Sequence, residues 1–171
     1  MRLLKIHGIG DVRLDPYERP AAGPKDVVVR MKACGICGSD ISYVERGGIP
    51  VGNSGLMPLG HEFSGEIVNT GGHAHFHVGQ AVAVCPAFAC GHCAACTSGA
   101  ENLCQNLLAM GYEIDGAFAE YVRIPAQGVA SGNVFALPVG LSFEAAALAE
   151  PLACVINGQE RAGVALGDTV A

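Results

Sequence analysis

The pattern of apolar and polar positions predicts a domain built mainly of short strands. Apolar and polar residues alternate at 116–124, as expected for a strand with one buried face. Short apolar runs predict further strands at residues 2–9, 26–32 and 63–69, and a turn followed by a strand within 78–84. Glycine and proline mark residues 10–25 as a connecting loop and 47–58 as a surface loop. This part of the chain is therefore expected to be largely β.

Helical patterns are confined to two places. A short helix is predicted near residues 41–45, after a glycine-rich segment. Ser142 has the chemistry of an N-cap, and the Ala/Glu-rich residues 143–148 predict a helix that Pro151 interrupts before a second one over 154–161. Residues 163–171 predict a turn and the start of a strand. Because such a strand has no partner to follow it, a further domain is expected after it.

Composition and charge exclude several classes of protein. The 171 residues are 50% apolar and 15% charged, which is typical of a chain that folds around a core. A net charge of −6 without a Lys/Arg cluster argues against nucleic acid as a partner. The sequence shows neither a signal peptide nor 18 consecutive apolar residues, so no membrane span is expected. Eight cysteines without a secretory signal favour metal ligands or reduced thiols and predict a cytoplasmic protein.

Four of these cysteines have the spacing of a metal site. Cys90, Cys93, Cys96 and Cys104 form C-x2-C-x2-C-x7-C, and four thiolates complete a tetrahedral shell around zinc. Such a closed site supports structure and leaves no position for a substrate. An iron–sulfur cluster is the alternative, but its motif continues with C-x3-C-P, whereas here seven residues intervene and Gln105 follows.

A second, dispersed set has the chemistry of an open metal site. Cys37 lies in a glycine-rich turn, His61 and Glu62 begin a strand, and Glu150 precedes Pro151. A catalytic zinc needs three protein ligands and keeps a fourth position for water or substrate. Taken singly, each of these residues also has an ordinary structural explanation. The alternating histidines 73, 75 and 77 are interpreted as solvated residues of a loop.

Several motifs together resemble the zinc-containing medium-chain alcohol dehydrogenases. Cys37-Gly38-Ser39-Asp40 and Gly60-His61-Glu62-Phe63-Ser64-Gly65 resemble the catalytic-zinc segments of that family, and the four-cysteine lobe resembles its structural-zinc lobe. Glu150-Pro151-Leu152 is similar to the sorbitol and threonine dehydrogenase branch. The resemblance implies a GroES-like catalytic domain, a β-barrel with short helices, over residues 1–149 with its zinc lobe at 85–104. Residues 150–171 would be a connecting helix and the start of a truncated Rossmann domain.

The resemblance also implies roles for individual residues. Cys37 and His61 would bind the catalytic zinc, with Glu62, Glu150 or both in exchange as the remaining ligand. Asp40 would accept a hydrogen bond from the His61 ring, and Ser39 would pass on the substrate proton. Ser42 stands where the family often has the outer histidine of this relay. The 47–58 loop and Tyr43 would lie near the substrate pocket.

The function implied is that of the catalytic domain of an NAD(P)-dependent alcohol or polyol dehydrogenase with one catalytic and one structural zinc. Its partner would be a small alcohol or polyol, and the full-length enzyme would be a homo-oligomer. No G-x-G-x-x-G motif occurs in the chain, so this stretch alone is expected to bind zinc without reducing NAD. The alternative is a zinc-binding scaffold module that performs no catalysis.

Overall fold

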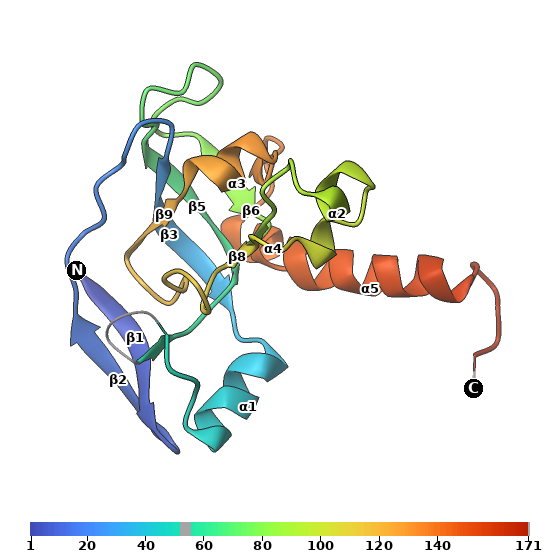
Figure 1. The fold of residues 1–171 in the computed structure, drawn as a ribbon, viewed down its shortest axis with the longest axis horizontal. Coiled ribbons are helices and arrows are strands. Elements are labelled where there is room, and N and C mark those ends of the chain that lie inside the picture. Colours follow the sequence, from blue (N-terminus) through green and yellow to red (C-terminus); the bar gives the residue numbers. More distant parts are fainter. Residues whose placement is uncertain (52–55, 171) are drawn as a thin grey trace.

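The structure is a computed structural model that describes residues 1–51 and 56–170 (Figure 1). Its body is a five-stranded antiparallel sheet in the order β10-β6-β5-β3-β9. These strands are β3 (Val27–Gly35), β5 (Glu62–Asn69), β6 (Ala81–Val84), β9 (Tyr121–Ile124) and β10 (Val134–Ala136). The predicted, mainly β fold class is confirmed. Within the described ranges, no helix is both long and apolar enough to cross a membrane.

The main core lies against this sheet, where the β-branched runs place their side chains. Val29, Phe63, Ile67, Val82 and Phe88 are at most 1% exposed. Every second residue of a strand faces the same side, so the apolar positions of β3 and β5 reach one cluster. Removing this much apolar surface from water is the main source of the stability of the domain.

A smaller sheet, in the order β2-β1-β4, corrects the prediction for residues 10–25. Strand β1 (Arg2–Gly8) pairs antiparallel with β2 (Asp11–Pro16), and β4 (Met57–Pro58) lies along the other edge of β1. The prediction of a loop was wrong over β2 because proline and charged residues hid an edge strand, whose backbone bonds come from β1. The turn between the two strands places Gly10 at a φ of 68°.

Two further predictions are corrected in part. Only Tyr121–Ile124 of the expected strand 116–124 joins the main sheet, because the preceding backbone pairs elsewhere: Ala117 N–H donates to the Gly60 carbonyl at 2.7 Å. In the expected surface loop 47–58, Val51 and Met57 are buried against Ile6, while residues 52–55 lie outside the described part. Of the three alternating histidines, those at 75 and 77 are exposed, as expected.

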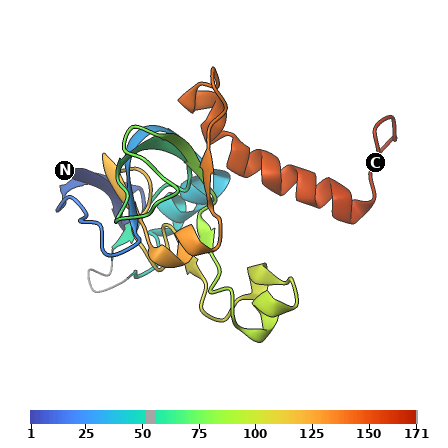
Figure 2. The ribbon, with the colours of Figure 1, turned by 90° about the horizontal axis from the view of Figure 1, so that it is seen from above.

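Short helices join the remaining strands. Helix α1 (Gly38–Arg46) is longer than the predicted 41–45, and α3 (Ala126–Ala130) lies between β9 and β10. The cysteine-rich segment contains β7 (Ala87–Phe88), α2 (Ala94–Thr97) and the 3₁₀ turn η1 (Glu101–Leu103), and it is followed by β8 (Leu108–Ala109), which pairs with β7. Figure 2 shows that α2 and η1 project from the body of the molecule.

The chain ends in helices α4 (Phe143–Ala147) and α5 (Ala149–Ala162). Pro151 does not separate the two helices as predicted, because the break falls at Leu148; Pro151 lies in the first turn of α5, where its missing N–H costs no intrahelical bond. Helix α5 therefore begins earlier than residue 154. Residues 163–170 form a turn but no strand, because within the described chain no strand lies beside them to complete a ladder.

The predicted N-cap of α4 is confirmed, and its contribution to the free energy of unfolding can be measured. Ser142 Oγ accepts a hydrogen bond from the Ala145 N–H at 3.2 Å. We expect Ser142→Ala to lower the free energy of unfolding by about 1 kcal/mol, the usual cost of a lost cap. Ser142→Thr keeps the hydroxyl and is the matched control in urea unfolding. If both substitutions cost the same, the hydrogen bond is not what stabilises the helix.

Candidate metal centres

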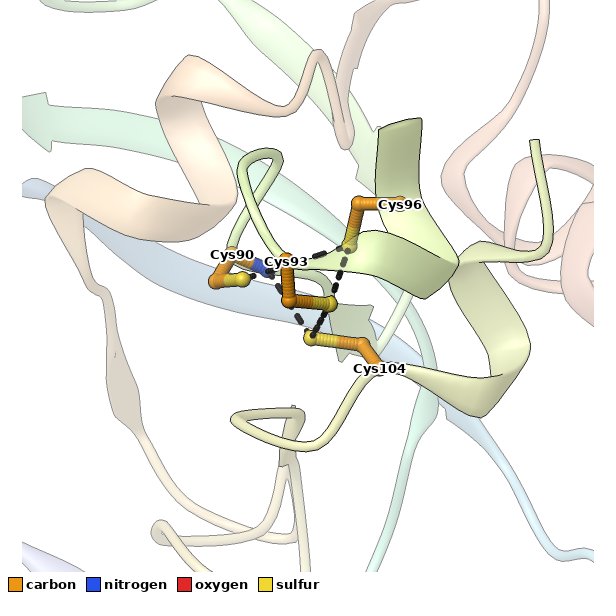
Figure 3. Close-up of side chains that lie close together, drawn as sticks. All are labelled: Cys90, Cys93, Cys96 and Cys104. Atoms are coloured by element: carbon orange, nitrogen blue, oxygen red, sulfur yellow. Dashed lines mark hydrogen bonds between the residues drawn. The ribbon is translucent and has the colours of Figure 1, made fainter. Parts of the chain in front are cut away.

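The four-cysteine lobe brings its thiols together around one point (Figure 3). Their sulfur atoms are 3.4 Å apart for Cys93 and Cys96, 3.9 Å for Cys93 and Cys104, and 4.0 Å for Cys90 and Cys96. Cys93 is the N-cap of α2, and Cys96 lies one turn later on the same helix. Cys104 follows η1, so a loop and two short helical turns position all four ligands.

These separations fit zinc. With Zn–S bonds of about 2.3 Å, the sulfur atoms of a tetrahedral site lie about 3.8 Å apart. The observed sulfur–sulfur distances are too long for disulfides, and all eight cysteines are free. Backbone N–H groups, that of His92 first, lower the pKa of Cys90 to about 6, whereas burial raises the pKa of Cys96 to about 12, so the lobe favours the thiolate that a metal requires at Cys90 first. The residues present therefore match a structural zinc site.

The dispersed set is only partly brought together. Cys37, His61 and Glu62 place their ligand atoms within 4.8 Å of one another. Cys37 is the N-cap of α1 and follows β3, while Glu62 begins β5 directly opposite Gly35. The pairing of β3 with β5 thus brings together residues 25 positions apart in the sequence. One thiolate, one imidazole and one carboxylate are a suitable ligand set for a zinc ion with an open position.

Two glycines make room for this group. A Cβ at Gly35 would overlap Oε2 of Glu62, so only glycine leaves space for the carboxylate there. Gly60 has a φ of 92°, and a Cβ at that position would lie 2.6 Å from the Phe118 backbone nitrogen. Lack of space for a Cβ therefore explains why glycine occupies both positions beside the candidate ligands.

Asp40 links the two segments, although by contacts other than the expected one. Its carboxylate accepts hydrogen bonds from the Cys37 N–H at 2.9 Å and the Gly60 N–H at 3.3 Å, and the residue is 5% exposed. His61 Nδ1 lies 3.8 Å from the carboxylate, which is longer than a hydrogen bond. Asp40 thus holds the backbone on both sides of the site and lies beside the imidazole as a charged neighbour.

Glu150 does not join the other three candidate ligands. It lies in the first turn of α5, where its Oε1 is 3.5 Å from the thiol of Cys154, one helical turn later. Ser39 lies in the first turn of α1, and Ser42 and Tyr43 lie further along the same helix. All three are half-buried. Of the two candidate carboxylates, the structure brings Glu62 to Cys37 and His61.

Two neighbours of this site were not singled out from the sequence. Cys34 is half-buried next to Gly35, and burial, and then the charges of Asp40 and Glu62, raise the pKa of its thiol to about 12. Tyr112, in the turn after β8, packs its ring edge to face on that of Tyr43, with centroids 5.7 Å apart. Neither residue stands in a motif; only the spatial pairing of distant segments reveals them.

Comparison with known proteins places this arrangement in a family. The alcohol dehydrogenase GroES-like domain matches residues 23–134, a span that contains the Cys37 group and the four-cysteine lobe. The chain belongs to the alcohol dehydrogenase GroES-like family. The family resemblance and the GroES-like fold predicted from the sequence are thereby confirmed.

Three proteins that are similar to this chain are dehydrogenases. A sorbitol dehydrogenase of Halalkalibacterium halodurans is 38% identical over 166 residues, which are 96% of this chain and 46% of that protein. An L-threonine 3-dehydrogenase of Idiomarina loihiensis is 32% identical over 161 residues, 91% of this chain and 45% of that protein. A solved dehydrogenase of Sinorhizobium meliloti 1021, described as zinc-binding and bound to NADP, superposes with a TM-score of 0.83 at 34% identity and covers 98% of this chain and 47% of that one. The chain spans about half the length of these relatives.

Proposed function

We propose that this GroES-like chain is the zinc-binding catalytic part of an NAD(P)-dependent alcohol or polyol dehydrogenase. The observation that carries the proposal is the convergence of Cys37, His61 and Glu62 within 4.8 Å, in a family of dehydrogenases. The four-cysteine lobe would hold a second, structural zinc. Similarity to a sorbitol dehydrogenase supports a polyol substrate.

The residues of the site would have separate roles in catalysis. Cys37, His61 and Glu62 would hold the catalytic zinc, and Asp40 would orient the backbone that carries them. When bound, zinc supplies a Lewis acid that lowers the pKa of a coordinated alcohol, and nicotinamide supplies the hydride acceptor. Ser39, two residues after Cys37 on α1, would take up the proton of the alcohol and pass it to solvent. Glu150, outside the ligand group, would act by exchange with Glu62.

The cofactor site would lie in the part of the relatives that this chain does not span. Helix α5 has no buried residue, and its apolar side chains Leu152, Val155 and Ile156 are 45–57% exposed. Such a helix suits the connection between a domain and the rest of a longer protein, which is the role proposed for residues 150–171. The 171-residue chain by itself should therefore bind zinc without reducing NAD.

Metal counting tests the proposal. We expect two zinc ions per chain, and we expect Cys37→Ala to lower this number to one because the site loses its only thiolate. The measurement is zinc content by elemental analysis after dialysis, with Cys85→Ala as the matched control for an exposed cysteine outside both candidate metal groups. That control should retain both ions.

Three results would each contradict a part of the proposal. One zinc per chain that is insensitive to Cys37→Ala would leave a scaffold module held by the four-cysteine lobe. Oxidation of alcohols by this chain with NAD, sensitive to Cys37→Ala, would contradict a cofactor site located elsewhere. A visible absorption band in the purified chain would indicate an iron–sulfur cluster in place of zinc.

A further inference from the structure

A second place with the chemistry of a binding site lies apart from both candidate metal centres. It is an open cavity of about 290 Å³ between residues 17–21, which follow β2, and the chain at Asp115 and Arg123. Glu18 and Arg19 are the other charged residues of its lining, and the hydroxyl-bearing Tyr17 joins them. None of these residues belongs to either group of candidate metal ligands.

The two arginines of this cavity are held in place by the sheet. Tyr121 and Arg123 point to the same side of β9 because they lie two residues apart on the strand. The guanidinium group of Arg19 stacks on the Tyr121 ring, 3.9 Å from the ring centroid. Arg123 Nη1 donates to Asp26 at 3.4 Å, and the buried Asp26 also accepts the Ala126 N–H at 2.9 Å. Both guanidinium groups therefore lie on one face of β9.

Asp115 has one oxygen engaged and one available. Tyr17 Oη donates a hydrogen bond to Oδ2 of Asp115 at 2.8 Å. Burial, and then this bond to Asp115, raise the pKa of Tyr17 to about 12, so the phenol keeps its proton at neutral pH. Within the described residues no hydrogen bond engages Oδ1 of Asp115, and this oxygen can accept one from a ligand.

The four charged groups of the cavity do not pair with one another. Over residues 1–51 and 56–170, the one ion pair that any of them forms joins Arg123 to Asp26, which does not line the cavity. Two positive and two negative groups thus share one open space. A simple anion would be repelled by the two carboxylates, and a simple cation would be repelled by the two arginines. A ligand that carries both charges avoids both repulsions.

We propose that this cavity binds a small zwitterion, with the carboxylate of the ligand on Arg19 and Arg123 and its ammonium group on Glu18 and Asp115. The planar guanidinium group matches the two oxygens of a carboxylate, and an ammonium group offers three donors to carboxylate acceptors. Ligand pockets usually measure about 300–1,000 Å³, so a cavity of about 290 Å³ suits a molecule with few non-hydrogen atoms. The site goes beyond the proposed function because it involves neither zinc nor the residues that would bind it.

Titration with 4-aminobutyrate, butyrate and butylammonium tests this inference. The first molecule carries both charges, and the other two carry one charge each on a carbon chain of the same length. Backbone amide NMR of the zinc-loaded 171-residue chain reports binding through shifts at residues 17–21 and 121–126. We expect saturable shifts there with a dissociation constant of about 1–10 mM for 4-aminobutyrate, and binding of the other two molecules that is weaker by about tenfold or more.

Substitution of the two unpaired charges tests each half of the site. Arg19→Gln and Glu18→Gln are each expected to weaken 4-aminobutyrate binding about tenfold, as for the loss of one charge-assisted hydrogen bond. Arg13→Gln is the matched control, because it changes an exposed arginine on β2 that pairs with Asp11, and it should keep the affinity of the parent chain.

The possible results are distinct. Butyrate that binds as tightly as 4-aminobutyrate would overturn the zwitterion and indicate a site for anions. No saturable shifts in the parent chain, or equal affinity in the parent and both glutamine variants, would overturn the site itself. Because zinc takes no part in this binding, either failure would leave the proposed function standing.

Discussion

Replacing Cys93 by serine is expected to remove one zinc per chain and to unfold the part of the lobe that carries the four cysteines, residues 90–104. The lobe has little else to stabilise it: its hydrophobic cluster contains only Ala89, Cys96 and Cys104 as buried members. Its two helical turns, Ala94–Thr97 and Glu101–Leu103, are too short to persist alone. Structural zinc contributes about 10–16 kcal/mol to the folding of small zinc domains, far more than this cluster provides.

The effect should be local. The β7–β8 pair and the five-stranded sheet keep their own contacts, so the core around Phe63 and Ile67 should stay folded. Amide exchange followed by NMR would show loss of protection within the lobe, while zinc content falls from two to one. Cys85→Ser, which alters an exposed cysteine outside the four ligands, is the matched control and should retain both ions. A lobe that stays protected without zinc would show that its own packing suffices.

Gly116→Ala is expected to produce the largest loss of stability among the glycine positions near the Cys37 site. A Cβ at this buried glycine would overlap the carbonyl oxygen of Leu59, which cannot move without shifting Gly60 and His61. Overpacking typically costs 1–3 kcal/mol, and we expect about 3 kcal/mol here because the obstacle is backbone. The measurement is the free energy of unfolding from urea titration of the zinc-loaded chain.

Gly158→Ala is the matched control. Gly158 lies inside α5 with open space around it and an ordinary φ, so alanine should raise the free energy of unfolding by up to about 1 kcal/mol. The same added methyl group would thus act in opposite directions at the two positions. If Gly116→Ala left stability unchanged, the close approach of residue 116 to Leu59 would not exist in solution.

Local signals in the sequence were sufficient for the elements that dominate the fold. The β-branched runs of β3 and β5 and the hydroxyl of Ser142 act through nearest neighbours, so a linear pattern reveals them. The four-cysteine lobe was equally readable because all its ligands fall within fifteen residues. The family resemblance, which the domain match confirms, supplied the grouping of Cys37 with His61 and Glu62.

Features that depend on pairing between distant segments could not be read in this way. Strand β2 pairs with an edge of β1, and its short alternation of polar and apolar residues over 11–15 was outweighed by the prolines and glycines that follow it. Tyr112 becomes part of the site only because the turn after β8 meets α1. Glu150 lies in the first turn of α5, apart from the Cys37 group, and neither the early start of this helix nor that separation could be read from the sequence.

The two backbone bonds of Asp40 have a consequence for how this site can change over generations. The same carboxylate fixes the start of α1 and the turn at Gly60, and both are needed before His61 can face Cys37. A substitution at position 40 would therefore alter folding, metal affinity and ligand orientation at once. A substitution at a surrounding side chain, such as Tyr112, can change one of these properties alone. A substitution at Asp40 changes all three in one step.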